Sequence, residues 1–139
     1  MTVPFSGGCL CGAVRYECSS EPVNIAHCFC TDCQKSSGTQ MSTNLLVPKA
    51  SVKVTKGKPA QYTRTGDSGK NVTRFFCSGC GSTLWSEGEV VPDLRIVKAG
   101  SLDDSSWVKP GISIYMDSAP KWSALPQGIP SFPKMPPAG

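Results

Sequence analysis

The chain has 139 residues, of which 39% are hydrophobic and 17% charged, a composition typical of one globular domain with a modest core. The net charge of +4 is scattered without a block of like charges or interleaved stacking aromatics, which argues against a nucleic-acid partner. The first eight residues lack a secretory signal and no apolar run could cross a bilayer, so we expect a cytoplasmic protein without membrane association.

Short runs in which apolar and polar residues alternate predict β-strands. With 14 glycines and 12 prolines available for turns, we expect a mainly β fold of antiparallel sheets in one domain, residues 1–139. The one helical turn follows Thr31 or Asp32 as its cap and ends at Gly38. The predicted strands are 13–18, 45–47, 52–56, 72–77, 94–98 and 112–116.

The segment after Ser118 is rich in proline and is predicted to be extended. A flexible linker would normally lack large apolar residues, whereas this segment has several at intervals. We therefore expect a docked tail that crosses the sheets, with apolar anchors at Trp122, Leu125, Ile129 and Phe132.

Seven of the eight cysteines fall into three clusters with one or two residues between neighbours. A zinc ion takes four soft donors at about 2.3 Å in a tetrahedron, and such spacings let thiolates converge on one ion. In a secreted chain the same number of cysteines would indicate disulfides, but a reducing compartment favours metal ligation. The clusters are Cys9-x-Cys11, Cys28-x-Cys30-x-x-Cys33 and Cys77-x-x-Cys80.

Two cysteine pairs on separate hairpins make the usual closed site, which predicts one structural zinc held by Cys9, Cys11, Cys77 and Cys80. Residues 77–81 would form a zinc knuckle in which two glycines relieve the backbone. Such an ion links distant parts of a small domain and so contributes to folding.

The remaining thiols, Cys28, Cys30 and Cys33, span six positions and would leave one side of a second zinc accessible. Two ions per chain are therefore predicted, the second catalytic. In the alternative, His27 or Cys18 closes this site. His27 otherwise serves as a proton-transfer or hydrogen-bonding group, or is a satisfied imidazole, and Cys18 is a buried small apolar residue.

Charge indicates which chemistry an open three-thiolate site favours. Three thiolates and a divalent cation sum to −1, so the metal acidifies water less than one held by neutral imidazoles. A soft zinc could instead accept a substrate thiol and keep it deprotonated. We expect a small-molecule enzyme acting at carbon–sulfur bonds; the alternatives are a noncatalytic zinc-stabilised module for protein interaction and a zinc hydrolase. The sequence does not define the oligomeric state.

Three blocks give the chain a resemblance to the glutathione-dependent formaldehyde-activating enzyme family, and the tail at 119–132 is similar to that family's closing segment. The resemblance implies a zinc-bound β-tent, the same division of the seven thiolates, and a lyase that joins glutathione and formaldehyde in S-hydroxymethylglutathione. The chain departs from the family pattern at Phe29, where family members commonly have histidine. The blocks are 8–16, 28–38 and 74–82.

Substrate contacts are expected in the residues that follow the middle cluster. Lys35 is placed to attract a carboxylate, such as those of glutathione as co-substrate, and polar neighbours extend the same stretch. The alternative is that they are exposed residues of a helical turn. The candidates are Gln34, Lys35, Ser36, Ser37 and Thr39.

Overall fold

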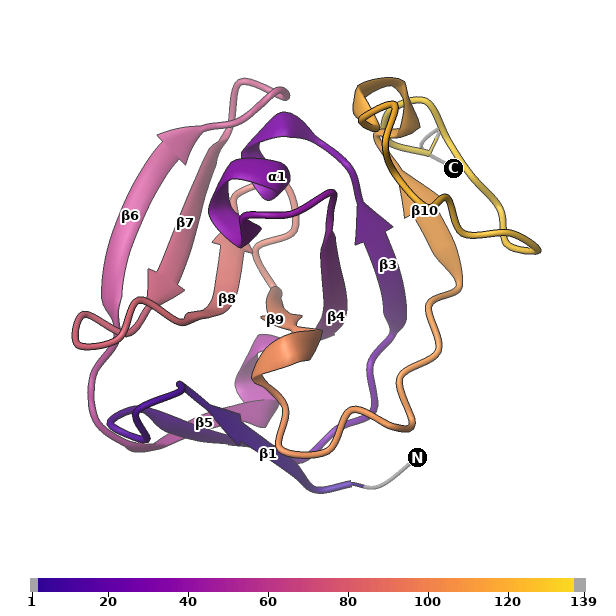
Figure 1. Ribbon diagram of the computed structural model, residues 1–139. Helices are drawn as coiled ribbons and strands as arrows, with labels where there is room; N and C mark the ends of the chain where they lie inside the picture. Colours follow the sequence, from indigo (N-terminus) through magenta and orange to yellow (C-terminus); the bar gives the residue numbers. More distant parts are fainter. Residues whose placement is uncertain (1–2, 137–139) are drawn as a thin grey trace.

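The computed structural model describes residues 3–136 as two β-sheets of unequal size, with one short α-helix (Figure 1). The smaller sheet has the order β1-β2-β5, formed by β1 (Phe5–Gly8), β2 (Arg15–Cys18) and β5 (Val52–Lys56). The larger sheet has the order β10-β3-β4-β9-β8-β7-β6. Its strands are β3 (Asn24–Cys28), β4 (Ser42–Pro48), β6 (Ala60–Thr65), β7 (Asn71–Phe76), β8 (Thr83–Gly88), β9 (Leu94–Lys98) and β10 (Ile112–Ile114). The helices are α1 (Thr31–Ser37) and the 3-10 turns η1 (Lys49–Ser51), η2 (Ala99–Ser101) and η3 (Met116–Ser118).

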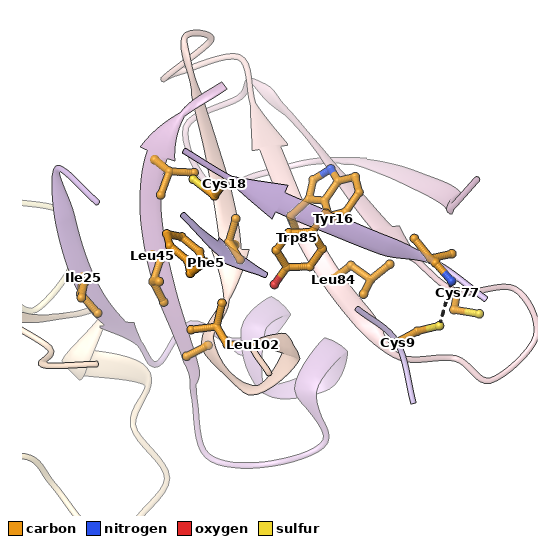
Figure 2. Packing of buried hydrophobic residues seen from close by; sticks show 14 residues of the cluster. Phe5, Cys9, Tyr16, Cys18, Ile25, Leu45, Cys77, Leu84, Trp85 and Leu102 are labelled. Atoms are coloured by element: carbon orange, nitrogen blue, oxygen red, sulfur yellow. Dashed lines mark hydrogen bonds between the residues drawn. The ribbon is translucent and has the colours of Figure 1, made fainter. Parts of the chain in front are cut away.

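The hydrophobic core lies between the two sheets (Figure 2). Trp85 of β8 is almost fully buried and stands edge-on to Tyr16 of β2, with ring centroids 5.7 Å apart, while Phe75 of β7 stacks on it at 5.5 Å. Leu45 of β4 and Val97 of β9 complete the same layer. Aromatic pairs of this kind add to the free energy gained by burial, so this cluster joins the small sheet to the large one.

The opposite face of the large sheet is free of this core and lines a cavity. Side chains alternate along a strand, so residues next to the core positions point the other way. Asn44 and Leu46 flank core residue Leu45, and Ile96 and Lys98 flank Val97 in the same manner; all four line the cavity. The strand period thus separates an apolar core face from a face that can take a ligand.

Helix α1 begins one residue earlier than expected. Cys30 is its N-cap, and the Cys33 N–H donates to the Cys30 Sγ at 3.3 Å, so neither Thr31 nor Asp32 caps it as predicted. A sulfur can take this role because the cap needs only an acceptor aimed at the third amide. The predicted end is confirmed: Gly38 adopts the left-handed conformation with φ of 75°.

The tail is docked, but by its backbone. The N–H of Ser113 in β10 donates to Pro130 O and the N–H of Phe132 donates to Ser113 O, both at 2.9 Å. Two of the predicted anchors are wrong, because Trp122 and Leu125 are 70% and 50% exposed, whereas Ile129 and Phe132 are half-buried. Proline removes donors without removing carbonyl acceptors, which lets this segment pair along one edge.

The predicted strands all occur, two of them, Val52–Lys56 and Leu94–Lys98, with the expected bounds. The pairing differs at the sheet edge, where β10 runs parallel to β3 instead of antiparallel. A long connection over residues 99–111 carries the chain back to that edge, as a parallel neighbour requires. None of the helices within residues 3–136 combines the length and the apolar character that a membrane span needs.

Candidate metal centres

Four sulfur atoms meet where the β1–β2 connection approaches the β7–β8 connection. The Sγ atoms of Cys9, Cys11, Cys77 and Cys80 all lie within 4.8 Å of one another. Cys11 Sγ is 3.6 Å from Cys9 Sγ and 3.7 Å from Cys77 Sγ. Four sulfurs at 2.3 Å from a zinc ion are about 3.8 Å apart along a tetrahedron edge, whereas a disulfide would hold two of them at about 2 Å. All four thiols are free, so the donor set fits zinc.

The local backbone explains why these residues converge. Gly12 and Gly81 each follow the second cysteine of a pair, with φ of 78° and 79°, a conformation that glycine adopts without strain. The N–H of Gly12 donates to Cys9 O and that of Gly81 to Cys77 O, so each pair is closed by a tight turn. The Val14 N–H donates to Cys9 Sγ at 3.2 Å and lowers the pKa of that thiol. The knuckle predicted at 77–81 is thus matched by a second turn at 9–12.

Ser82 connects the two turns. Its Oγ accepts the Leu10 N–H at 2.9 Å, which leaves its own O–H to donate to Cys80 Sγ at 3.2 Å. The hydrogen bonds from the Ser82 side chain and backbone lower the pKa of Cys80 to about 5. A partner that supports a ligand in this way is a feature of built metal sites.

Replacing Ser82 by alanine is expected to weaken zinc binding at the four-cysteine site by 10- to 100-fold, because Cys80 and Leu10 lose their shared partner. Competition with a chromophoric chelator measures the change. Ser78→Ala in the same knuckle is the matched control, since Ser78 is exposed and makes no side-chain hydrogen bond within residues 3–136. Equal affinities for the two variants would contradict a supporting role for Ser82.

The second cluster contains Cys28, Cys30 and Cys33, whose Sγ atoms also lie within 4.8 Å of one another. Cys28 ends β3 and Cys33 lies in the first turn of α1, so the strand-to-helix turn gathers the three thiols. Hydrogen bonds from Cys28 and Cys33 lower the pKa of Cys30 to about 2. The hydrogen bond between Cys28 and Cys30 also raises the pKa of Cys28. One sulfur therefore carries negative charge readily and the donor set suits a soft cation.

All three of these cysteines line the cavity on the outer face of the large sheet, which has a volume of about 590 Å³. The cavity is bounded by the sheet, by α1, by the turn between β6 and β7 and by residues of the tail. A volume of this size suits a small organic molecule. Within residues 3–136, no histidine or carboxylate joins the group as a fourth donor, so its accessible side faces the cavity.

Lys98 is one of the cavity residues that the sequence did not indicate. It lies opposite Asn44 in the β4–β9 pairing, and its Nζ donates to Asn44 Oδ1 at 2.9 Å. Burial lowers the pKa of Lys98, and its charge acts on the thiol of Cys33. The only sequence signal was a lysine at the end of a predicted strand, which gives no hint of the cysteine cluster.

His27 and Cys18 lie apart from the three-cysteine cluster. The side chain of His27 lies on one face of the sheet and that of Cys28 on the other. The Nδ1 of His27 is 2.9 Å from Thr43 Oγ1, and desolvation lowers the pKa of the imidazole. Cys18 is fully buried in the core, 3.4 Å from the Ser51 hydroxyl, as expected for a small apolar residue. Phe29 is also fully buried and is absent from the cavity lining.

The expected substrate contacts, on α1 and just after it, lie outside the cavity lining. Gln34 Nε2 donates to Phe29 O at 2.8 Å and to Ser118 O at 2.9 Å, so it ties the helix to the following segments. Lys35 is exposed, and Thr39, with Ser36 and Ser37, borders a separate surface hollow. Thr31 and Asp32 of the same helix line the cavity instead.

The chain is similar to several curated proteins. A Fusarium vanettenii protein is 32% identical over 126 residues, covering 82% of this chain and 64% of its own length. A Penicillium rubens protein is 30% identical over 129 residues, covering 83% and 65%. A Halomonas elongata protein is 28% identical over 124 residues, covering 84% and 77%. All three are named "Putative glutathione-dependent formaldehyde-activating enzyme". The chain thus spans somewhat less than two thirds of the two fungal relatives.

A crystal structure of a Rhodobacter sphaeroides protein shares the fold, with a TM-score of 0.58 and 22% identity over 76% of this chain and 91% of that one. Fold and site together define a mainly β protein with a closed four-cysteine cluster and an open three-cysteine cluster, both suited to metal. The sequence model of the glutathione-dependent formaldehyde-activating enzyme matches residues 4–118. The chain belongs to this family.

Proposed function

We propose that this protein is a zinc-dependent enzyme that forms or breaks a carbon–sulfur bond in a thiol adduct, with S-hydroxymethylglutathione formation as the first reaction to test. The observation that carries the proposal is the three-cysteine cluster, whose accessible side faces a cavity of about 590 Å³. Family membership and the names of the relatives support the same reaction class.

The reaction joins the thiol sulfur to the aldehyde carbon. The sulfur–carbon bond forms as the carbonyl π bond opens, and the thiol proton finishes on the new hydroxyl group. A zinc ion held by Cys28, Cys30 and Cys33 would supply Lewis acidity for lowering the pKa of a substrate thiol. The protein positions these donors at the junction of β3 and α1, and the cavity walls hold the reactants together.

The partner is accordingly a small molecule, and the compartment that we propose is the cytoplasm. All eight cysteines are free thiols in the structure, which suits a reducing environment. Zinc at the four-cysteine cluster would have a separate role, because the cluster joins residues 9 and 80 and so stabilises the fold.

Exchange spectroscopy of glutathione with formaldehyde tests the activity, with zinc-loaded protein and without protein. The adduct also forms without a catalyst, so the expected result is interconversion faster than this background by at least tenfold at micromolar protein. Other thiols follow in the same assay. If zinc-loaded protein with two ions per chain accelerated no thiol in either direction, the carbon–sulfur proposal would be wrong.

A further inference from the structure

The strands of the large sheet form one wall of the cavity, which we call the cavity floor. Hydrogen-bond donors gather on this floor beside the three-cysteine cluster. An ammonium group only donates, so the contact from Lys98 Nζ identifies the facing atom of Asn44 as its amide oxygen. The Ser42 hydroxyl donates to the same oxygen, and both Ser42 and Asn44 are buried. With its oxygen occupied twice, Asn44 retains its N–H groups, which meet no acceptor within residues 3–136. Lys98 and Asn44 therefore present N–H groups to the cavity beside the cluster.

A guanidinium group adds to this positive region. Arg74 of β7 also lines the cavity, and its charge acts on both Lys98 and Cys30. Within residues 3–136, neither Arg74 nor Lys98 forms an ion pair with a carboxylate. Their negative neighbours are the thiolates of the three-cysteine cluster, and once a metal ion neutralises most of that charge the two cations favour a further anion.

The carboxylates of the cavity belong to other elements. Asp32 of α1 pairs with Arg64 at 3.6 Å, and Asp67 accepts a hydrogen bond from the Tyr115 hydroxyl at 3.3 Å. Asp117 lies in η3. The strands themselves contribute no carboxylate to the described lining. Apart from the thiols, the charged side chains that the strands contribute to the lining are therefore all cations, although the cavity as a whole contains both signs of charge.

Beyond this polar row the cavity floor carries the aliphatic pair Leu46 and Ile96, which lies between the polar residues Asn24 and Ser86. Strand register places Asn44 opposite Lys98, and two residues further Leu46 opposite Ile96. Cys28 of β3 pairs with Ser42, which precedes Asn44 by two residues on β4. Cys28 therefore lies on one side of the Asn44–Lys98 pair, and Leu46 and Ile96 lie on the other. The floor thus runs from sulfur, through donors, to an aliphatic pair, and Val72, Val90 and Val91 add further aliphatic side chains to the cavity lining.

We propose that the cavity selects a mercapto acid: a thiol that also bears a carboxylate, with an apolar carbon body. The carboxylate binds Lys98, Asn44 and Arg74, and the carbon body lies on the Leu46–Ile96 strip. This inference rests on the proposed function, since it takes the open cysteine site as the place where the thiol binds. It predicts a preference for apolar mercapto acids over glutathione, whose peptide groups would meet the aliphatic strip.

Titration calorimetry with the zinc-loaded full chain tests this preference. The probes are 6-mercaptohexanoate, its neutral amide, 3-mercaptopropionate and glutathione. We expect 6-mercaptohexanoate to bind at least tenfold more tightly than its amide, because the amide cannot form the charged hydrogen bonds of the carboxylate. It should also bind at least tenfold more tightly than the shorter acid, since each buried methylene contributes about fourfold. Equal affinity of acid and amide, or tighter binding of glutathione, would overturn the proposal.

Two lysine variants make the charge test specific. Lys98→Met should weaken 6-mercaptohexanoate binding at least tenfold and leave the amide unchanged, and Lys98→Arg should restore most of the loss. Lys35→Met removes the same charge from an exposed position outside the cavity lining and should change neither ligand. Zinc content and circular dichroism confirm that each variant is folded. Equal effects of Lys98→Met and Lys35→Met on the acid, or no effect of Lys98→Met, would contradict the site.

Hexanoate, which has no thiol, separates this inference from the proposed function. Its binding is expected to be weaker than that of the mercapto acid but still lowered by Lys98→Met. If hexanoate binds in this manner and no thiol reaction is accelerated, the acid site stands and the enzyme proposal fails. If glutathione turns over while no acid depends on Lys98, the enzyme proposal stands and the mercapto-acid inference is wrong.

Discussion

Cys80→Ser is expected to release zinc from the four-cysteine site and to unfold or aggregate the domain. This site joins the turn at Cys9 to the knuckle at Cys77, 68 positions along the chain, and both cysteines are buried at the edge of the core. Structural zinc contributes about 10–16 kcal/mol of binding free energy, which matches or exceeds the whole stability of a domain, about 5–15 kcal/mol. Zinc analysis after dialysis and thermal unfolding by circular dichroism measure both effects.

Cys18→Ser is the control for this variant. Cys18 is more deeply buried than Cys80, but it lies outside both clusters, and a serine hydroxyl can keep its contacts with Ser51 and with the carbonyl of Ser20. It should retain two zinc ions and unfold within a few degrees of the wild type. If Cys80→Ser instead kept two ions and its melting temperature, the four-cysteine cluster would not be a structural site.

The two cysteine clusters could be predicted from the sequence because their members are close neighbours within each motif. The spacing of Cys9 and Cys11, and of Cys77 and Cys80, already limits where four sulfurs can meet, and the structure brings together the same two sets. Strands such as Leu94–Lys98 could be predicted for a similar reason, because the alternation that indicates a strand lies within the strand itself. Local patterns of this kind do not depend on which strands become neighbours.

The cavity depends on strand register and could not be predicted in this way. Lys98 meets Asn44 only because β4 and β9 pair in one register, 54 residues apart in the chain. Lys35 looked suitable because it is two residues from Cys33, yet the helix directs it to solvent. In a helix, residues two positions apart point to different sides, so closeness to Cys33 in the sequence does not bring Lys35 to the cavity. The edge strand β10 has three residues, too few for a period to reveal its parallel pairing.

Cys30→Ser is expected to remove one zinc ion and reduce turnover to the uncatalysed background while the domain stays folded. The three thiols span only residues 28–33, so an ion bound there links a short loop and restrains the unfolded chain little. Serine also preserves the second role of Cys30, because a hydroxyl at this N-cap can accept the Cys33 N–H as the sulfur does. Zinc analysis, the exchange assay and thermal unfolding of the same sample measure the three outcomes.

Cys30→Ala separates the cap from the metal. Alanine removes the acceptor as well, so it should lose the same ion and the same turnover but be less stable than Cys30→Ser by about 1 kcal/mol. Because α1 has seven residues and its C-cap is intact, that cost should not unfold the domain. Retention of turnover by either variant would mean that the three-cysteine cluster is not the reactive centre, whereas unfolding of Cys30→Ser as complete as that of Cys80→Ser would mean that both clusters are structural.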